Sequence, residues 1–195
     1  MIPPAVIAAA LRSAGPFPGG PTIDILCQAL AAAITSWLPT GVALTGVTTG
    51  VVGAGAVTGT LAFSATPTAV QGAMAAWTGP TTSYLATMLA AGLNSGLAGL
   101  PYAGVSVGVG SGLDTSHVVS ANVPALATLL RTTHSAMCSP MGGSGAMTPV
   151  FYDALAAGVG VVVLTGMTVP PTGVVAPTAP LGPSSSVGTS TSFPV

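Results

Sequence analysis

The expected fold depends on three similar stretches: Leu30-Ala31-Ala32-Ala33-Ile34, Leu89-Ala90-Ala91-Gly92-Leu93 and Leu155-Ala156-Ala157-Gly158-Val159. The three copies are 59 and 66 residues apart. Recurrence at such an interval is typical of a repeated supersecondary unit, and here it indicates three imperfect repeats of about 60 residues. Because Ala, Gly, Val and Leu are abundant throughout the chain, a chance match is the alternative.

Each stretch falls within a segment that the sequence predicts to be a short helix. A proline precedes or opens each segment, and a threonine or serine is available as the N-cap, as is usual at helix starts. The predicted helices cover residues 23–37, 82–97 and 148–159, with N-caps at Thr22, at Thr81 or Ser83, and at Thr148. Second helices are predicted over residues 67–77 and 123–137.

After each of the three helices comes a stretch rich in Gly, Thr and Val, which favours extended structure. These stretches cover residues 42–63, 103–121 and 161–175. In one of them Val105, Val107 and Val109 alternate with smaller residues, so the three valines are expected on one face of a strand and Gly108 on the other, where the backbone of a neighbour can approach closely.

We therefore predict an α+β fold in which short helices alternate with Gly/Thr/Val-rich β segments. The predicted parts are an N-terminal segment (1–21), a helix-β-helix unit (22–80), a second helix-β-helix unit (81–147), a truncated helix-β unit (148–175) and an extended arm (176–195). The arm is rich in Pro, Ser and Thr, and we expect it to lie along a groove or sheet edge of a neighbouring chain and to become ordered mainly on assembly.

Charge is almost absent from this sequence. The charged residues are Arg12, Asp24, Asp114, Arg131 and Asp153, with no Lys and no Glu, whereas roughly a quarter of the residues of a soluble domain are usually charged. Two arginines cannot neutralise many phosphates, which excludes a substantial nucleic-acid interface. A surface with so little charge needs to be covered, either by neighbouring subunits or by lipid.

An integral membrane protein, small and channel-like or holin-like, is the alternative to an assembly subunit. The best candidate span covers residues 41–63, but it contains five Thr and six Gly. The two arginines do not cluster beside it, and prolines divide the rest of the chain into short apolar segments. A secreted surface-layer or coat protein is a third reading, in which the apolar run from Ala5 to Leu11 belongs to a weak secretory signal cleaved near Ala14.

Few residues could carry catalysis. Asp114 and His117 lie close to Ser111 and Ser116, but this spacing is too short for a typical Ser-His-Asp triad, and neither of these serines lies in a GxSxG motif. We interpret residues 111–117 as a polar turn between two strands, in which Asp114 accepts hydrogen bonds from backbone amides. The chain is therefore predicted not to be an enzyme and to have no catalytic residue.

No cofactor-binding or metal-ligating residue is predicted either. His134 and Cys138 would share one face of a helix, but a zinc site needs more ligands than these two. The glycine-rich stretches lack a Walker lysine and a GxGxxG motif. Cys27 and Cys138 are expected to be buried free thiols.

Taken over its whole length, the chain resembles the minor structural proteins of tailed bacteriophage virions. The likeness is one of composition: a short, nearly uncharged chain rich in Ala, Gly, Thr and Val, with an end rich in Pro, Ser and Thr. The resemblance implies a component of the tail, baseplate or neck, located in the virion after assembly in the host cytoplasm. It implies further copies of the chain and other virion proteins as partners, and no small-molecule substrate.

Overall fold

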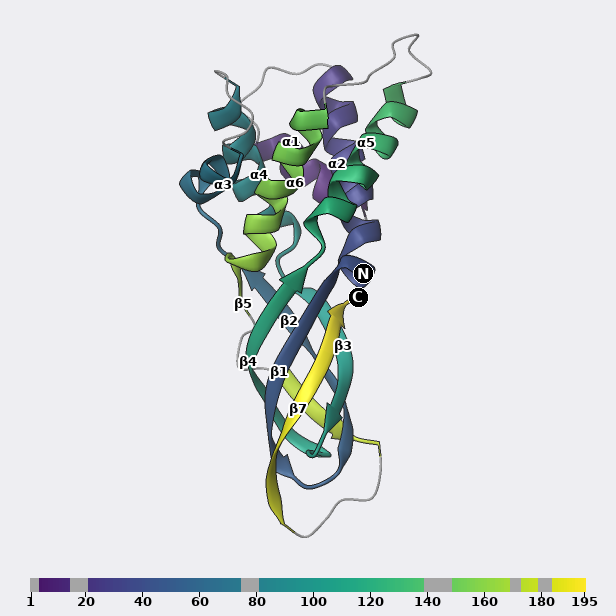
Figure 1. Cartoon of the computed structure of the whole chain (residues 1–195), viewed down its shortest axis with the longest axis vertical. Coiled ribbons are helices and arrows are strands. Elements are labelled where there is room, and N and C mark those ends of the chain that lie inside the picture. Colours follow the sequence, from purple (N-terminus) through teal and green to yellow (C-terminus); the bar gives the residue numbers. More distant parts are fainter. Residues whose placement is uncertain (1–3, 15–20, 75–80, 139–148, 169–172, 179–183) are drawn as a thin grey trace.

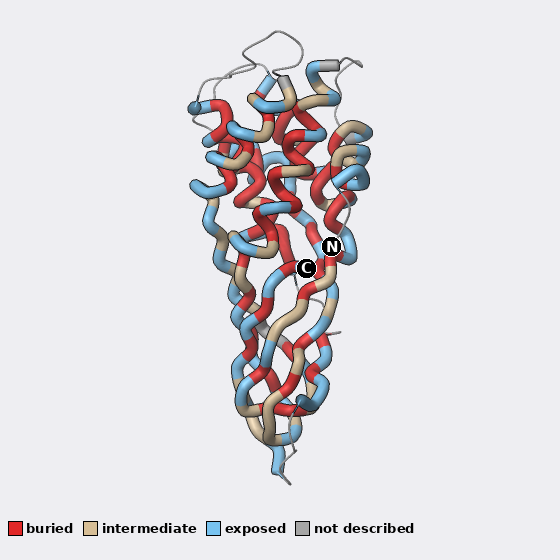
Figure 2. The backbone as a smooth tube through the Cα atoms, turned by 90° about the vertical axis from the view of Figure 1, so that its right-hand side faces the viewer, coloured by how far each residue is buried: buried red, intermediate tan, exposed pale blue. Residues whose placement is uncertain are grey.

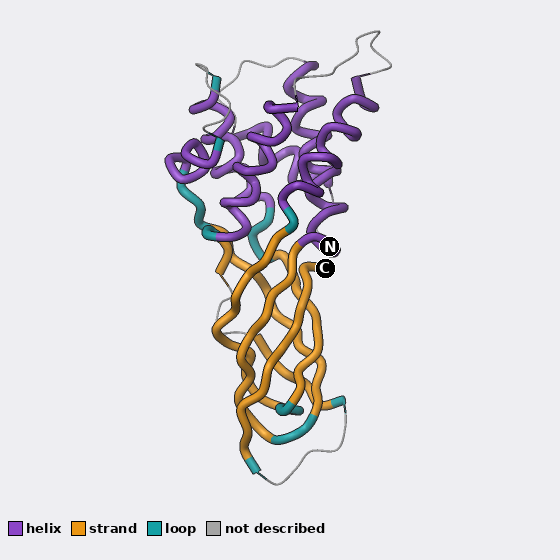
Figure 3. The backbone as a smooth tube through the Cα atoms, in the orientation of Figure 1, coloured by secondary structure: helices purple, strands orange, loops and turns teal. Residues whose placement is uncertain are grey.

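Among the residues that the structure describes, six helices gather at one end of the molecule and a β-barrel forms the other (Figures 1 and 3). The structure is a computed structural model, and it describes residues 4–14, 21–74, 81–138, 149–168, 173–178 and 184–195. The helices, in chain order, are α1 (Pro4–Ala14), α2 (Pro21–Gly41), α3 (Pro67–Ala73), α4 (Thr82–Gly96), α5 (Val123–Cys138) and α6 (Pro149–Leu164).

The strands alternate with these helices along the chain, as the sequence predicts for an α+β protein. They are β1 (Val42–Val51), β2 (Ala54–Phe63), β3 (Leu100–Val107), β4 (Ser111–Ala121), β5 (Met167–Thr168), β6 (Gly173–Pro177) and β7 (Ser185–Pro194). Most of these segments are rich in Val, Thr, Ser and Gly, with alternating exposed and less exposed positions, as expected of strands with one inward and one outward face.

Six strands close into an antiparallel barrel. Their order is β3-β7-β1-β4-β6-β2, and pairing of β2 with β3 closes the ring, while the short β5 pairs with the end of β2. Closure satisfies the hydrogen-bonding edges that an open sheet would leave free. Contacts made by the outside of this barrel must therefore be made by side chains.

The apolar core lies mainly between the helices and at the end of the barrel nearest to them, where red, buried segments are most frequent in Figure 2. Leu30, Leu89 and Leu155, from the three similar stretches, are fully buried there. The helices α2, α4 and α6 are therefore held by packing of their apolar faces, as is usual for helices of this length.

The order of elements agrees with helix, two strands, helix for residues 21–73 and again for residues 82–138. The two strands of each unit, however, are not hydrogen-bonded to each other. In the barrel order, β1 lies three strands away from β2 in both directions, and β3 lies three strands away from β4. Every strand pairs with strands of other units, so the barrel is built jointly by all of them.

The extended arm predicted for residues 176–195 is wrong for the described residues 185–194. These residues form β7, which pairs with β1 on one side and β3 on the other. The alternation of serines and threonines with Gly and Val suits an inward and an outward face of a barrel strand, whereas the composition alone suggested a flexible segment.

Two further expectations are corrected. Residues 111–117, interpreted as a turn, belong to strand β4, which pairs with β1 over most of its length. The helix α6 continues to Leu164, although extended structure was expected from residue 161, because Val162 and Val163 are buried in the core.

Candidate functional site

Asp114 is the centre of a polar cluster inside the barrel. Its carboxylate is fully buried and accepts hydrogen bonds from Ser190 Oγ at 2.6 Å, from Tyr102 OH at 3.1 Å and from His117 Nε2 at 2.7 Å. These partners come from β7, β3 and β4. The cluster therefore links three strands across the interior of the barrel.

A β-bulge brings Asp114 and His117 to the same side of the strand. Residues three apart in a regular strand point to opposite faces. In β4, Val118 lies opposite Thr45 and Thr115 lies opposite Val47, so two residues of β4 occupy the space opposite Gly46 alone. The extra residue shifts the alternation, and both side chains point inward.

Gly46 provides the space for this cluster. A Cβ atom at position 46 would lie 2.5 Å from Ser190 Oγ, 2.6 Å from His117 Nε2 and 2.8 Å from Asp114 Oδ1. Any side chain at this position would displace the groups that hydrogen-bond to Asp114. Glycine opposite the bulge is thus a steric requirement of the cluster.

Burial raises the pKa of Tyr102, and the negative charge of Asp114 and the hydrogen bond to it act in the same direction. The side chain of His117 is only 2% exposed and its ring meets that of Tyr102 edge-on, with centroids 5.6 Å apart. In the described part of the chain, His117 Nδ1 and Ser192 Oγ are buried without a hydrogen-bond partner.

The cluster is not the Ser-His-Asp triad that was considered from the sequence, in which Ser111 or Ser116 would join Asp114 and His117. The Asp–His contact forms, but the serine hydroxyl at the cluster belongs to Ser190 and donates to Asp114, not to His117. A hydrolytic triad needs the serine hydroxyl bonded to the histidine. Asp114 also bonds to side chains, where backbone amides had been expected, so that part of the turn interpretation is wrong.

Comparisons with known proteins do not identify the chain. No protein-family model, no curated protein and no solved structure matches it. What the site can do therefore has to be judged from its geometry.

The other predicted candidate residues lie in the helical half. His134 Nδ1 lies 2.8 Å from Tyr152 OH, and burial lowers the pKa of His134. Cys27 is a buried free thiol, as expected, whereas the side chain of Cys138 lies outside the described residues. Among the described residues, no group of three or more His, Cys, Asp or Glu side chains is placed to hold a metal ion.

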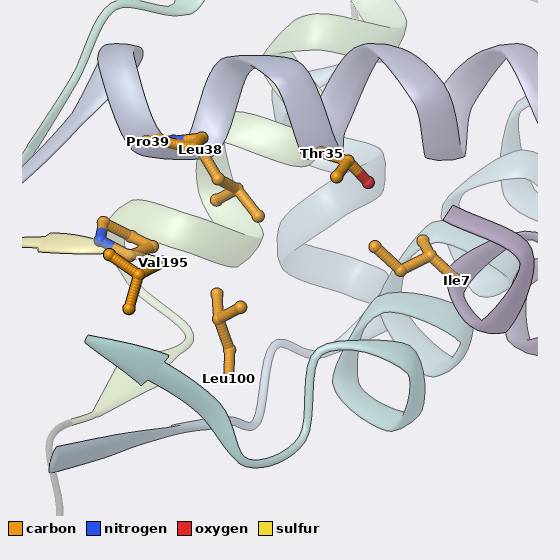
Figure 4. A pocket seen from close by; sticks show the side chains of 7 residues that line it. Ile7, Thr35, Leu38, Pro39, Leu100 and Val195 are labelled. Atoms are coloured by element: carbon orange, nitrogen blue, oxygen red, sulfur yellow. The ribbon is translucent and has the colours of Figure 1, made fainter. Parts of the chain in front are cut away.

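A small cavity lies where the helices meet the barrel (Figure 4). It has a volume of about 10 Å³, which leaves room for no more than one water molecule. Ile7, Leu38, Leu100 and Val195 are among the side chains that line it. The cavity is thus a packing gap between the two halves and is too small for an organic ligand.

A larger and open groove lies between α5 and α6. It has a volume of about 530 Å³, and Arg131 and Asp153 line it together with Pro124 and Tyr152. One cation and one anion in an open groove do not define a ligand chemistry. The polar cluster around Asp114 is therefore the best-defined candidate site, and its burial and bonding fit it for holding three strands together.

Proposed function

We propose that the chain is a non-enzymatic structural subunit of a large protein assembly that acts through apolar contacts between subunits. The observation that carries this proposal is the outer face of the barrel. Four of the five charged residues lie on helices, and the fifth, Asp114, is buried. The outside of the barrel has no charged side chain.

Large apolar side chains stand exposed on that face. They occur on five adjacent barrel strands, β3, β7, β1, β4 and β6, and exposed fractions reach 72% at Val118. The exposed residues are Val47, Val51, Val105, Val107, Leu113, Val118, Val174, Val187 and Phe193. Exposed large apolar side chains on so many adjacent strands favour a protein or membrane contact.

A repeated unit also supports an assembly role, because repeats suit stacking and ring formation. Aligned on Leu30, Leu89 and Leu155, the helices α2, α4 and α6 bury the same positions. Further aligned positions are buried in all three copies, among them Leu26, Leu85 and Phe151; Cys27, Ala86 and Tyr152; Ala31, Ala90 and Ala156; Ile34, Leu93 and Val159; and Leu38, Leu97 and Val163, of which Leu97 directly follows α4. This shared burial register supports the proposal of three imperfect repeats of one unit.

The tailed-phage virion is the assembly that we propose, with the tail, baseplate or neck as the location and assembly in the host cytoplasm. Further copies of the chain and other virion proteins are the proposed partners, with neither nucleic acid nor a small-molecule substrate. The compositional resemblance supports this placement, and the uncharged barrel surface is compatible with a subunit enclosed by neighbours.

An integral membrane protein is the second candidate, favoured by one helix. Residues Thr22–Gly41 are long and apolar enough to cross a membrane. However, 56% of the most apolar window of this helix is buried inside the protein, where it serves as a core helix. The uncharged barrel surface is compatible with lipid as well, so detergent dependence is the property that separates the two candidates.

The test is size-exclusion chromatography with light scattering on the full chain, run without detergent and again with a mild detergent. We expect soluble rings or polymers without detergent, because apolar contacts between copies cover the barrel surface. A chain that is soluble only as detergent-bound monomers would contradict the proposal and favour the membrane candidate. A soluble monomer in both runs would contradict self-assembly.

A further inference from the structure

The barrel carries the same register three times. Val47 of β1 lies opposite Thr115, Val105 of β3 lies opposite Thr191, and Val174 of β6 lies opposite Thr58. The next residue of each strand points inward, and these residues also form matching pairs: Thr48 with Asp114, Ser106 with Ser190, and Val175 with Val57. By these matching pairs, β1, β3 and β6 occupy equivalent positions in the barrel.

The same correspondence maps β2, β4 and β7 onto one another, and the strand order agrees with it. Moving two places along the ring β3-β7-β1-β4-β6-β2 takes β3 to β1, β1 to β6 and β6 back to β3, and all neighbours are antiparallel. Such a shift is a rotation by one third of a turn about the barrel axis. The barrel therefore has pseudo-threefold symmetry in its strand order, direction and register.

Helix packing follows the same rotation once α1 is included. The helix α5 packs against α2 and α6, α3 packs against α6 and α4, and α1 packs against α4 and α2. These are three copies of one arrangement. In the first two units α3 comes directly after β2 and α5 comes directly after β4. In the third unit α1 occupies the corresponding position in space, next to the end of β7. The third unit, expected to be truncated, thus has its second helix at the start of the chain.

Buried side chains support this place for α1. Each of the three helices has a buried residue at its fourth position and another four residues later: Ile7 and Leu11, Val70 and Met74 (which directly follows α3), Leu126 and Leu130. Ile7 of α1 and Val195, which follows β7, line the same small cavity (Figure 4). The end of β7 and the beginning of α1 are therefore neighbours in space.

We propose that the chain is a closed ring of three equivalent units and that each unit presents one equivalent docking face to a neighbouring copy of this chain. The docking faces are centred on Val47, Val105 and Val174, whose exposed fractions are 38%, 60% and 51%. This inference rests on the proposed function and adds to it the identity of the partner, the surface and the number of contacts.

A second copy of the chain fits these faces because of their charge and their geometry. The outer face of the barrel carries neither sign of charge, so two copies meet without like-charge repulsion and without desolvating an ion. A charged partner would find no complementary group there. Three equivalent faces around one axis give each chain up to three neighbours of the same kind, as in closed symmetric assemblies or layers.

The test compares three single variants, Val47→Glu, Val105→Glu and Val174→Glu, with the full chain in light scattering over a concentration series. Each variant is expected to raise the concentration needed for assembly by about tenfold or more, because it buries an unpaired charge at one face. Salt at high concentration is expected to leave the wild-type assembly intact, since no ion pairs hold it together. Circular dichroism establishes that each variant is folded.

Val150→Glu is the matched control, because Val150 is 45% exposed but lies in the first turn of α6, where a negative charge is favourable. Where a glutamate variant does not fold, Val→Thr at the same position keeps the β-branched shape and is expected to weaken assembly less. Loss of assembly in one barrel variant alone, or an equal loss in Val150→Glu, would overturn the inference. A wild-type chain that does not assemble would instead contradict the proposed function.

Discussion

Replacing Asp114 with alanine is expected to lower the free energy of unfolding by about 3–5 kcal/mol. The carboxylate accepts hydrogen bonds from Ser190, Tyr102 and His117, and all three side chains are enclosed in the barrel. Its removal leaves three buried donors without this acceptor, and each such donor is costly where water cannot replace the lost bond. Chemical denaturation of the purified chain measures the change.

Asp24→Ala is the control for this experiment. Asp24 pairs with Arg12, but its side chain is half exposed, so the pair is expected to contribute only about 0–1 kcal/mol. Asp114→Asn keeps one acceptor oxygen and should fall between the two. If Asp114→Ala were no more destabilising than Asp24→Ala, the cluster would have no structural role and its assignment as a strand-linking site would be lost.

The three leucines Leu30, Leu89 and Leu155 provide the second large prediction. Each is fully buried at the same aligned position of α2, α4 or α6, and truncation to alanine is expected to cost about 2–5 kcal/mol in unfolding free energy. Because the three sites are equivalent in the account given above, the three losses should be similar. Thermal or denaturant unfolding of the three single variants gives the comparison.

Leu164→Ala serves as the control, since Leu164 ends α6 and is 41% exposed. It is expected to change stability by no more than about 0.5 kcal/mol. A large loss at one leucine with negligible losses at the other two would argue against equivalent units, even if the core packing around that one residue were important.

Local patterns in the sequence were sufficient to predict most of the helices. Helix α4 was predicted over 82–97 and spans Thr82–Gly96, and α5 was predicted over 123–137 and spans Val123–Cys138. Proline near the start and apolar residues at helical spacing are local signals, and burial of those same residues is what stabilises the helices. The prediction of an α+β protein is confirmed for the same reason.

The barrel could not be predicted, because its pairings join residues far apart in the chain. The strand β7 lies between β1 and β3, and nothing within residues 185–194 identifies those neighbours. The serines at 190 and 192 could have been read as the inward face of a strand, since they alternate with threonines. Composition rich in Pro and Ser instead suggested an arm.

The polar cluster was missed for two physical reasons. Its serine, Ser190, lies 76 residues from Asp114 in the sequence. The bulge that turns Asp114 and His117 to the same face depends on the register with β1, which the sequence of β4 alone does not specify. Gly46 opposite the bulge is a further signal, but it acquires meaning only once the pairing is known.

Circular permutation tests the ring of three units most directly. Along this sequence α1 is the first described helix and β7 the last described strand, and the place equivalent to the β7–α1 junction in the second unit is the junction of β4 with α5. A permutant that joins Val195 to Met1 through a short Gly/Ser linker and opens between Ala121 and Asn122 should keep every packed element. A second permutant, opened between Val118 and Val119 inside β4, is the control.

We expect the permutant opened before Asn122 to fold cooperatively, with a melting temperature within a few degrees of that of the unpermuted chain, and the permutant opened inside β4 to be strongly destabilised. An unfolded or molten permutant at the Ala121–Asn122 junction, with the natural chain stable under the same conditions, would contradict the claim that α1 completes the third unit.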